Sequence, residues 1–156
     1  MGEWKKGIVE GEGVHKSKNG QRYEGAFKNF LKHGWGKEAL PNGDQFEGMY
    51  REGQPHGRGK YHWADGTEYE GDFEFGLRNG KGILITKEGF SYEGDFMMEE
   101  AHGSCQISYG KGKFYTGEVK NGRRNGKGTL RLAVEHKVFD GYWKNDEFED
   151  EKPTKP

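Results

Sequence analysis

The chain has 156 residues, of which 30% are hydrophobic, 33% are charged and 14% are aromatic, and its formal net charge is −1. A charge this close to zero argues against a nucleic-acid-binding protein, because such proteins carry a clear basic excess. The hydrophobic fraction is low enough for a disordered chain, but disordered chains are poor in aromatic residues, so we expect a folded protein.

The sequence carries no membrane or targeting signal. No apolar run approaches the ~18 residues of a transmembrane helix, and the N-terminus lacks the apolar segment of a signal peptide. The single cysteine, Cys105, cannot form an internal disulfide and fits a reducing compartment. We therefore expect a soluble, cytoplasmic protein.

The sequence repeats with a period of 23 residues, as the two copies of YEGDF at 69–73 and 92–96 illustrate. A period of this length is typical of repeat arrays. We expect residues 1–150 to form one such array. In chain order its units are 2–22 (lacking the first two positions), 23–45, 46–68, 69–91, 92–114, 115–138 (with one extra residue) and the half-unit 139–150, followed by a polar C-terminal tail at 151–156.

Each unit is predicted to form a β-hairpin. Counted from the leading aromatic residue, positions 1, 3 and 5 are aromatic, glycine and aromatic, and positions 14, 16 and 18 are glycine and then often apolar. This alternation is typical of strands, and no stretch has helical periodicity over three turns. The expected fold is all-β, an elongated single-layer antiparallel β-meander of stacked hairpins with roughly thirteen strands. Tight turns are predicted at Asn19-Gly20, Asn42-Gly43 and Asp65-Gly66.

Glycines at positions 3 and 14 fall on the same face as the rings. Because glycine usually weakens a strand, its recurrence here needs a packing reason. We expect each glycine to let a ring of the neighbouring unit lie flat on the backbone, so that the core is one aromatic face. The position-3 glycines are Gly25, Gly48, Gly71, Gly94, Gly117 and Gly141, and the position-14 glycines are Gly36, Gly59, Gly82 and Gly128.

The repeated pattern Y-E-G-x-W/F-x-x-G-x-x-H/N-G-x-G, with a further glycine seven residues on, resembles the MORN repeat (membrane occupation and recognition nexus) over residues 2–150. MORN domains of known structure are similar to the meander expected here. The resemblance implies a non-enzymatic scaffold or adaptor in a cytoskeletal or membrane-linked assembly such as a ciliary axoneme. A cytoskeleton- or cilium-associated location is implied in the same way.

No residue set predicts catalysis, a metal or a cofactor. His33, His56 and His102 share position 11, and equivalent atoms two strands apart lie about 10 Å from one another, too far to ligate one zinc ion. We expect these side chains to cap turns. The position-2 carboxylates have repeated, equivalent surroundings, and Cys105 has neither a base nor a cation beside it in the sequence. We therefore expect no catalytic, metal-ligating or cofactor-binding residues.

Two sets of residues are expected to contact a protein partner, which we expect to be a helix or an extended segment. The first is the aromatic face, since an uncovered groove of rings and glycines suits a partner helix. The second is a set of apolar residues where the hairpin link should be polar, and exposed apolar residues of this kind mark interaction sites. Alternatively, the second set folds back over the aromatic face and closes the core. The first set comprises Tyr23, Phe27, Phe46, Tyr50, Tyr69, Phe73, Tyr92, Phe96 and Trp143, and the second comprises Phe30, Leu31, Met97 and Met98, together with Ile8, Val9, Phe75 and Leu77.

Three other interactions stay open at the level of sequence. The end strands are able to pair with another copy, giving self-association. The family resemblance suggests phosphoinositide or membrane-lipid binding, but the basic pairs Lys5-Lys6 and Arg123-Arg124 are far apart, so we expect it to be weak. The array also resembles the accessory MORN modules of some lipid kinases and methyltransferases.

Overall fold

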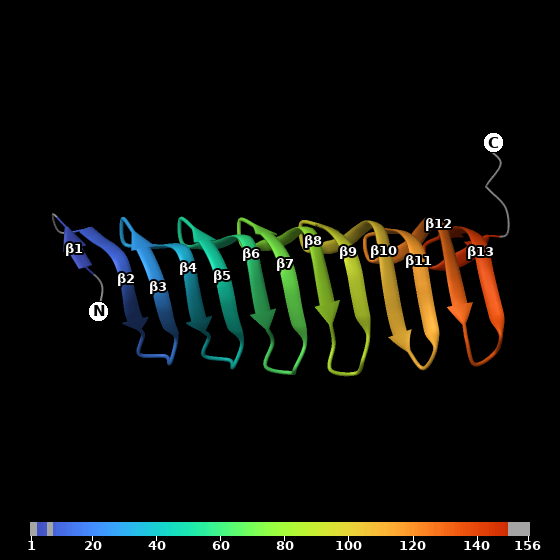
Figure 1. Ribbon diagram of the computed structural model, residues 1–156, viewed down its shortest axis with the longest axis horizontal. Helices are drawn as coiled ribbons and strands as arrows, with labels where there is room; N and C mark the ends of the chain where they lie inside the picture. Colours follow the sequence, from blue (N-terminus) through green and yellow to red (C-terminus); the bar gives the residue numbers. More distant parts are fainter. Residues whose placement is uncertain (1–2, 6–7, 150–156) are drawn as a thin grey trace. The chain divides into compact units, whose positions relative to one another are not determined.

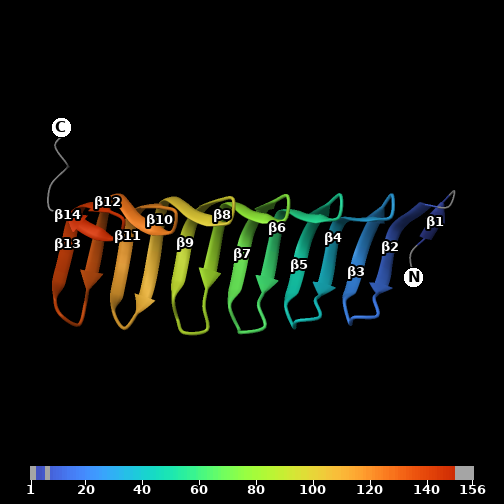
Figure 2. The same cartoon turned by 180° about the vertical axis from the view of Figure 1, so that it is seen from behind.

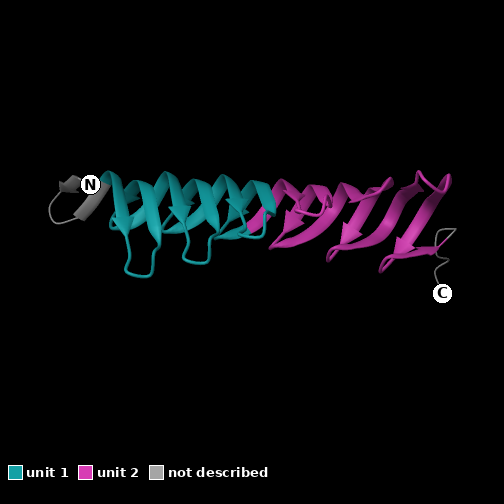
Figure 3. Ribbon diagram, turned by 90° about the horizontal axis from the view of Figure 1, so that it is seen from below, with its two compact units in different colours: residues 1–77 teal, residues 78–156 magenta. Residues whose placement is uncertain are grey.

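The computed structural model describes residues 3–5 and 8–149, with side chains from residue 11 onward (Figure 1). The chain divides into two compact units, residues 1–77 and 78–156 (Figure 3). The described residues of both units form β-strands and turns and no helix. The prediction of an all-β fold made of consecutive antiparallel hairpins is therefore confirmed.

Each strand of unit 1 pairs with the next strand along the chain in antiparallel fashion, and the same holds in unit 2 from β8 onward, as seen from both sides in Figures 1 and 2. The half-unit after residue 138 forms two strands. The strands of unit 1 are β1 (Glu3–Lys5), β2 (Ile8–Lys16), β3 (Arg22–Lys28), β4 (Leu31–Ala39), β5 (Gln45–Arg51), β6 (Gln54–His62) and β7 (Glu68–Glu74). Then follow β8 (Leu77–Ile85), which starts at the last residue of unit 1, β9 (Ser91–Met97), β10 (Glu100–Gly110), β11 (Lys113–Lys120), β12 (Arg123–Leu132), β13 (Lys137–Lys144) and β14 (Glu147–Glu149).

Two kinds of turn alternate along the chain. Except at the two-residue turn Lys111-Gly112, longer loops connect the repeat units, and they include the predicted Asn-Gly and Asp-Gly pairs, with Gly43 at φ +96° and Gly66 at φ +97°. The short turns are the tips of the hairpins within a unit, and both central residues have positive φ, as in a type I′ turn. Asn121 (φ +50°) and Gly122 (φ +75°) are one such pair.

Each tip is tied to the hairpin before it. The second residue of the tip donates its backbone N–H to a carbonyl of the preceding hairpin, from Gly53 to Lys32 and from Gly76 to Pro55 in unit 1. The position-11 side chain accepts a second bond, since Nδ1 of His56 receives the N–H of Phe75 at 3.4 Å. Asn79 and Asn125 do the same for Met98 and Asn145 in unit 2. The turn-capping role expected for position 11 is thus observed at His56.

The predicted rings form the core of each unit. The buried hydrophobic side chains are Tyr23, Phe46, Tyr50, Tyr69 and Phe73 in unit 1, and Tyr92, Phe96, Cys105, Ile107, Tyr115, Val119, Leu130 and Trp143 in unit 2. Neighbouring repeats meet edge to face, with ring centroids 5.2 Å apart for Tyr23 and Tyr50 and 5.8 Å apart for Tyr115 and Trp143. Such contacts stabilise beyond the burial of area alone.

The expected role of the position-14 glycines needs a correction. A Cβ placed on Gly36 would lie 2.4–2.6 Å from the ring of Tyr23, which belongs to the same unit, and one on Gly59 would lie 2.5 Å from the ring of Phe46. The ring that lies on the glycine therefore comes from the same hairpin rather than from the neighbouring unit. Antiparallel pairing explains this, because it places position 1 of the first strand close to position 14 of the second. Neighbouring units instead meet through their ring edges.

Candidate binding surfaces

The structure places the predicted aromatic set inside the fold. Eight of the nine rings are at most 6% exposed, and Phe27 is half-buried. The hairpins bend where position 12 adopts positive φ, at Gly34 and Gly57 for example, and the ladder shifts register beside each bend. As a correction to the expected open groove, these rings are buried inside the fold rather than exposed along a groove. The buried rings are Tyr23, Phe46, Tyr50, Tyr69, Phe73, Tyr92, Phe96 and Trp143.

Cationic side chains at position 10 help to cover these rings. The guanidinium of Arg124 lies 4.7 Å from the centroid of the Trp143 ring, and it also bonds to the backbone carbonyl of Asp146 at 3.0 Å. Arg78 repeats the arrangement over Phe96 at 5.3 Å. These contacts were not predicted from the sequence. The feature that could have indicated them is the basic residue at position 10 of three units.

In unit 1 the corresponding cation is Lys32. Its ammonium lies 5.3 Å from the ring centroid of Tyr23 and 5.7 Å from that of Tyr50, and it pairs with the carboxylate of Glu38. Burial, followed by the negative charges of Glu12 and Glu38, raises the pKa of Tyr23 to about 12. The hydroxyl of Tyr23 therefore stays protonated well above its ordinary pKa, and the ammonium faces a neutral ring in a cation–π contact.

The second predicted set, at the hairpin tips, is exposed. In unit 1 these residues are Phe30, Leu31 and Phe75, with Phe75 60% exposed, and in unit 2 they are Met97 and Met98. Leu77 is half-buried, and the side chains of Ile8 and Val9 lie outside the described part of the chain. These tip residues do not close the core, so the alternative of a folded-back edge is wrong for them. We call Phe30, Leu31 and Phe75 the unit 1 tip residues, and Met97 and Met98 the unit 2 tip residues.

Three of the tip residues also have an unfavourable backbone conformation. Phe30 has φ +67°, Phe75 has φ +50° and Met98 has φ +45°. Left-handed φ costs a side chain with a Cβ roughly 1–2 kcal/mol, and asparagine or glycine is the usual choice. The tip at Asn121-Gly122 shows that the same hairpin accepts the usual residues. The apolar tips therefore combine local strain with exposure.

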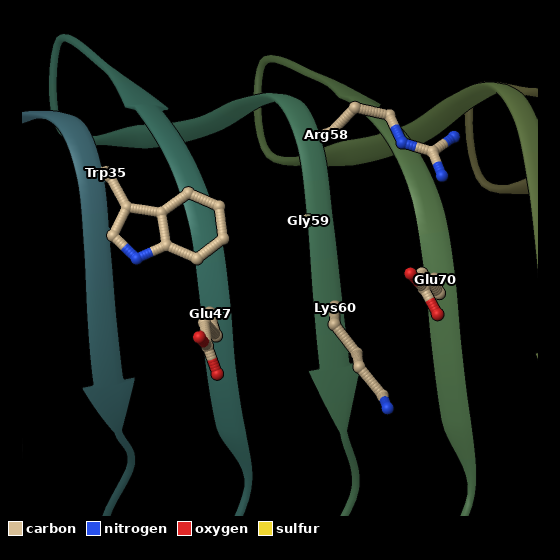
Figure 4. Close-up of a pocket in the computed structure, with 6 residues that line it drawn as sticks. All are labelled: Trp35, Glu47, Arg58, Gly59, Lys60 and Glu70. Atoms are coloured by element: carbon tan, nitrogen blue, oxygen red, sulfur yellow. The ribbon is translucent and has the colours of Figure 1, made fainter.

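A second surface lies on the face of unit 1 opposite the rings. Strand alternation carries positions 2, 4, 13 and 15 to that face. A pocket of about 260 Å³ forms there across β4 to β7, lined by Trp35, Glu47, Arg58, Gly59, Lys60 and Glu70 (Figure 4). Trp35 is 51% exposed and lies directly across the ladder from Met49, which is also exposed. The sequence signal was an aromatic residue at position 13, where the other complete units carry arginine, lysine or serine.

The charged groups around this pocket are unequally paired. Arg58 lies 3.6 Å from the carboxylate of Asp72, and Lys60 lies 3.8 Å from that of Glu68. The ammonium of Lys37 lies 3.9 Å from the carboxylate of Glu47, which is longer than either of these two ion pairs. Among the residues that the structure describes, Glu70 makes no ion pair.

The thiol of Cys105 is held in the core of unit 2 at repeat position 14. Burial raises the pKa of this thiol to about 12, although a hydrogen bond from Tyr92 opposes the shift. Since the thiolate is the nucleophile, we expect Cys105 to react at least 100-fold more slowly with an aromatic disulfide reagent at pH 8 than after unfolding in urea. Equal absorbance traces for the folded and unfolded protein would contradict this burial.

Residues 11–149 contain no cluster of three or more histidine, cysteine or acidic side chains placed to hold a metal ion. Within the described chain, no helix is present that is long and apolar enough to cross a membrane.

A family model of the MORN repeat matches residues 1–22, 23–45, 46–68, 69–89 and 115–133, which together cover more than half of the chain. The unit at 92–114, in which Cys105 replaces the position-14 glycine, lies between the matched segments, yet it forms β9 and β10. No curated protein matches the sequence.

Proposed function

Because the chain belongs to the MORN-repeat family, we propose that it is a non-enzymatic scaffold that binds a partner protein along its hairpin tips. Repeats of this kind are consistent with a binding module. The family resemblance further suggests a cytoskeletal or ciliary assembly as the setting, and a location there.

The observation that carries this proposal is the strained, exposed apolar tip. A tip selected for stability alone would use Asn-Gly, as at Asn121-Gly122, and would expose polar groups to water. Phe75 and Met98 instead place side chains that disfavour positive φ at the turn, and they expose apolar area to water. Backbone strain kept at an exposed position is typical of functional sites, and apolar side chains at such a position suit a protein interface.

Side-chain chemistry favours a polypeptide partner at these tips. Phenylalanine fills pockets in interfaces with little loss of conformational freedom, and methionine adapts to irregular apolar surfaces. In unit 1 the tip hydrogen bonds that join successive hairpins hold Phe75 at a fixed place on the edge. A helix or strand that presents an apolar stripe is a suitable occupant.

The proposal is tested by photocrosslinking in the native assembly. A photoreactive phenylalanine analogue replaces Phe75 in one version of the protein and Asn121 in another. Both residues occupy position 7 of a tip, so the two probes are matched in exposure and conformation. We expect a discrete crosslinked partner from position 75 and little from position 121. Equal products from both, or none from position 75, would remove the tips from the interface.

A second candidate function, binding to an anionic membrane surface, is favoured by one corner of unit 2. Two loops meet there, since the N–H of Ala133 donates to the carbonyl of Gly112 at 2.8 Å. Val134 is 78% exposed beside Lys111 and Lys113. Glu135 lines the same hollow but pairs with Lys137, and an apolar side chain with lysines on the facing loop suits the boundary between lipid headgroups and acyl chains.

If this corner binds lipid, Val134→Asp will lower the apparent affinity for vesicles of acidic phospholipid by roughly tenfold, because it replaces inserted apolar area by a negative charge. Sedimentation with vesicles at physiological salt measures the effect. Val138→Asp, at another exposed valine on β13, is the control and should bind like the wild type. Wild-type protein that stays in the supernatant would exclude this function.

A further inference from the structure

We propose that the pocket on the exposed face of unit 1 binds one positively charged side chain, arginine or lysine, carried by an extended segment of a partner protein. This site lies on the opposite face of the strands from the rings and uses none of the tip residues. The inference therefore does not depend on the function proposed for the tips.

Trp35 supplies the first half of the site. At position 13 the other complete units carry Arg58, Lys81, Ser104 and Lys127, all suited to a solvated face. The indole has no role in the core, since it points away from the buried rings and is half exposed. In Figure 4 it extends from β4 across β5 toward the pocket. Among aromatic side chains, the indole attracts a cation over its face most strongly.

The carboxylates supply the second half. Figure 4 shows Glu47 on β5 below the indole and Glu70 on β7 at the far side of the pocket. Glu47 has only the distant ammonium of Lys37, and Glu70 makes no ion pair with any described residue. A cation between the indole and these carboxylates gains both contacts at once.

The two basic residues of the pocket do not oppose this assignment. Arg58 and Lys60 point toward β7, where Asp72 and Glu68 accept their charges. Their engagement also argues against a phosphate or another anion as the occupant. Such a ligand would have to break two ion pairs and approach Glu47 and Glu70.

The floor of the pocket favours an extended chain. Positions 3 and 14 face the buried rings, so at Gly48 and Gly59, which pair across β5 and β6, the exposed face of the sheet consists of backbone alone. A partner backbone is therefore able to approach the sheet closely. A planar guanidinium is able to stack on the indole and donate to a carboxylate in the same pose, which makes arginine the better fit.

The test is an NMR titration of the whole protein, labelled with ¹⁵N, in which the indole N–H of Trp35 is the reporter. The probe is a capped Gly-Ser-Arg-Ser-Gly peptide, and its matched control carries citrulline, the neutral isostere of arginine. We expect a saturable shift of the indole signal at millimolar arginine peptide, weakened by added salt, and roughly fivefold or more weaker binding of the citrulline peptide.

Two variants assign the effect to the pocket. Glu70→Lys should abolish the saturable shift. Glu93→Lys changes the same repeat position in a unit where Ser104 replaces the tryptophan, and it should bind as the wild type does. The dispersion of the backbone amide signals verifies that each variant is folded. Equal binding of the arginine and citrulline peptides, an absent shift in the wild type, or unchanged binding by Glu70→Lys would each overturn the proposal.

Discussion

Replacing Tyr115 by alanine is expected to lower the free energy of unfolding by about 3–5 kcal/mol, the usual range for removing a large buried ring. Tyr115 is fully buried, and its ring packs edge to face with Trp143 at 5.8 Å. Its hydroxyl donates to the backbone carbonyl of Glu118 at 2.7 Å. Its ring also covers Gly128, so alanine would leave a cavity over exposed backbone. Urea denaturation followed by tryptophan fluorescence measures the loss.

The adjacent residue provides the control for this experiment. Phe114 lies on the same strand, β11, but points to the other face and is 46% exposed. We expect Phe114→Ala to change the free energy of unfolding by less than about 1 kcal/mol. Similar losses for the two variants would show that the buried row is not the core of unit 2.

The second large effect is expected from adding one methyl group at a position-14 glycine. A Cβ on Gly59 would lie 2.5 Å from the ring of Phe46 and also 3.4 Å from that of Phe73. Because both rings are packed in the core, neither has room to move away. Gly59→Ala should therefore destabilise the protein by about 1–3 kcal/mol, measured by the same denaturation, even though the backbone of Gly59 does not need positive φ.

A double variant identifies the cause of that loss. If the methyl group collides with the ring of Phe46, the smaller side chain in Phe46→Leu should relieve the collision. The combined variant would then lose at least about 1 kcal/mol less than the sum of the two single variants. Strictly additive losses would mean that the glycine serves a purpose other than close contact with this ring.

The strands and the core were predictable because both follow from local periodicity. Alternation fixes which residues share a face, so a sequence that places Tyr69, Gly71 and Phe73 two apart predicts that they point the same way. The Asn-Gly and Asp-Gly pairs fix the turns by their tolerance of positive φ. Both patterns span only a few residues, so they can be recognised in the sequence without knowledge of the tertiary structure.

The burial of the rings was less predictable, since it depends on contacts between hairpins. The bend at Gly57 and the placement of Arg124 over Trp143 both require knowledge of the preceding or following repeat. Sequence alternation alone leaves the ring face uncovered, which favoured a partner groove there. Which ring contacts each position-14 glycine likewise depends on the register of the antiparallel strands, and the repeat pattern of the sequence does not specify this register.

The candidate surfaces were partly predictable for the same reason. Phe30 and Met98 stand out as apolar residues in a link that is polar elsewhere, and their exposure agrees with that signal. The site around Trp35 was not predicted, although Trp35 departs from the arginine, lysine or serine at position 13 of the other complete units. Departures from a repeat are informative only when each position is assigned to a face.

The central claim is that the buried rings stabilise the fold and that the exposed hairpin tips bind a partner protein. Phe75→Asn tests it most directly, because asparagine suits the turn before Gly76 but removes the exposed ring. The substitution removes the contact between the rings of Phe75 and His56, whose centroids lie 5.4 Å apart. Asparagine tolerates the left-handed φ at this position better than phenylalanine does, and this gain offsets the lost contact. We predict that the free energy of unfolding of this variant lies within about 1 kcal/mol of the wild-type value or above it. We also predict that the variant recovers much less of the partner that crosslinking at position 75 identifies in the wild type. Undiminished recovery of that partner by a folded Phe75→Asn protein would contradict the claim.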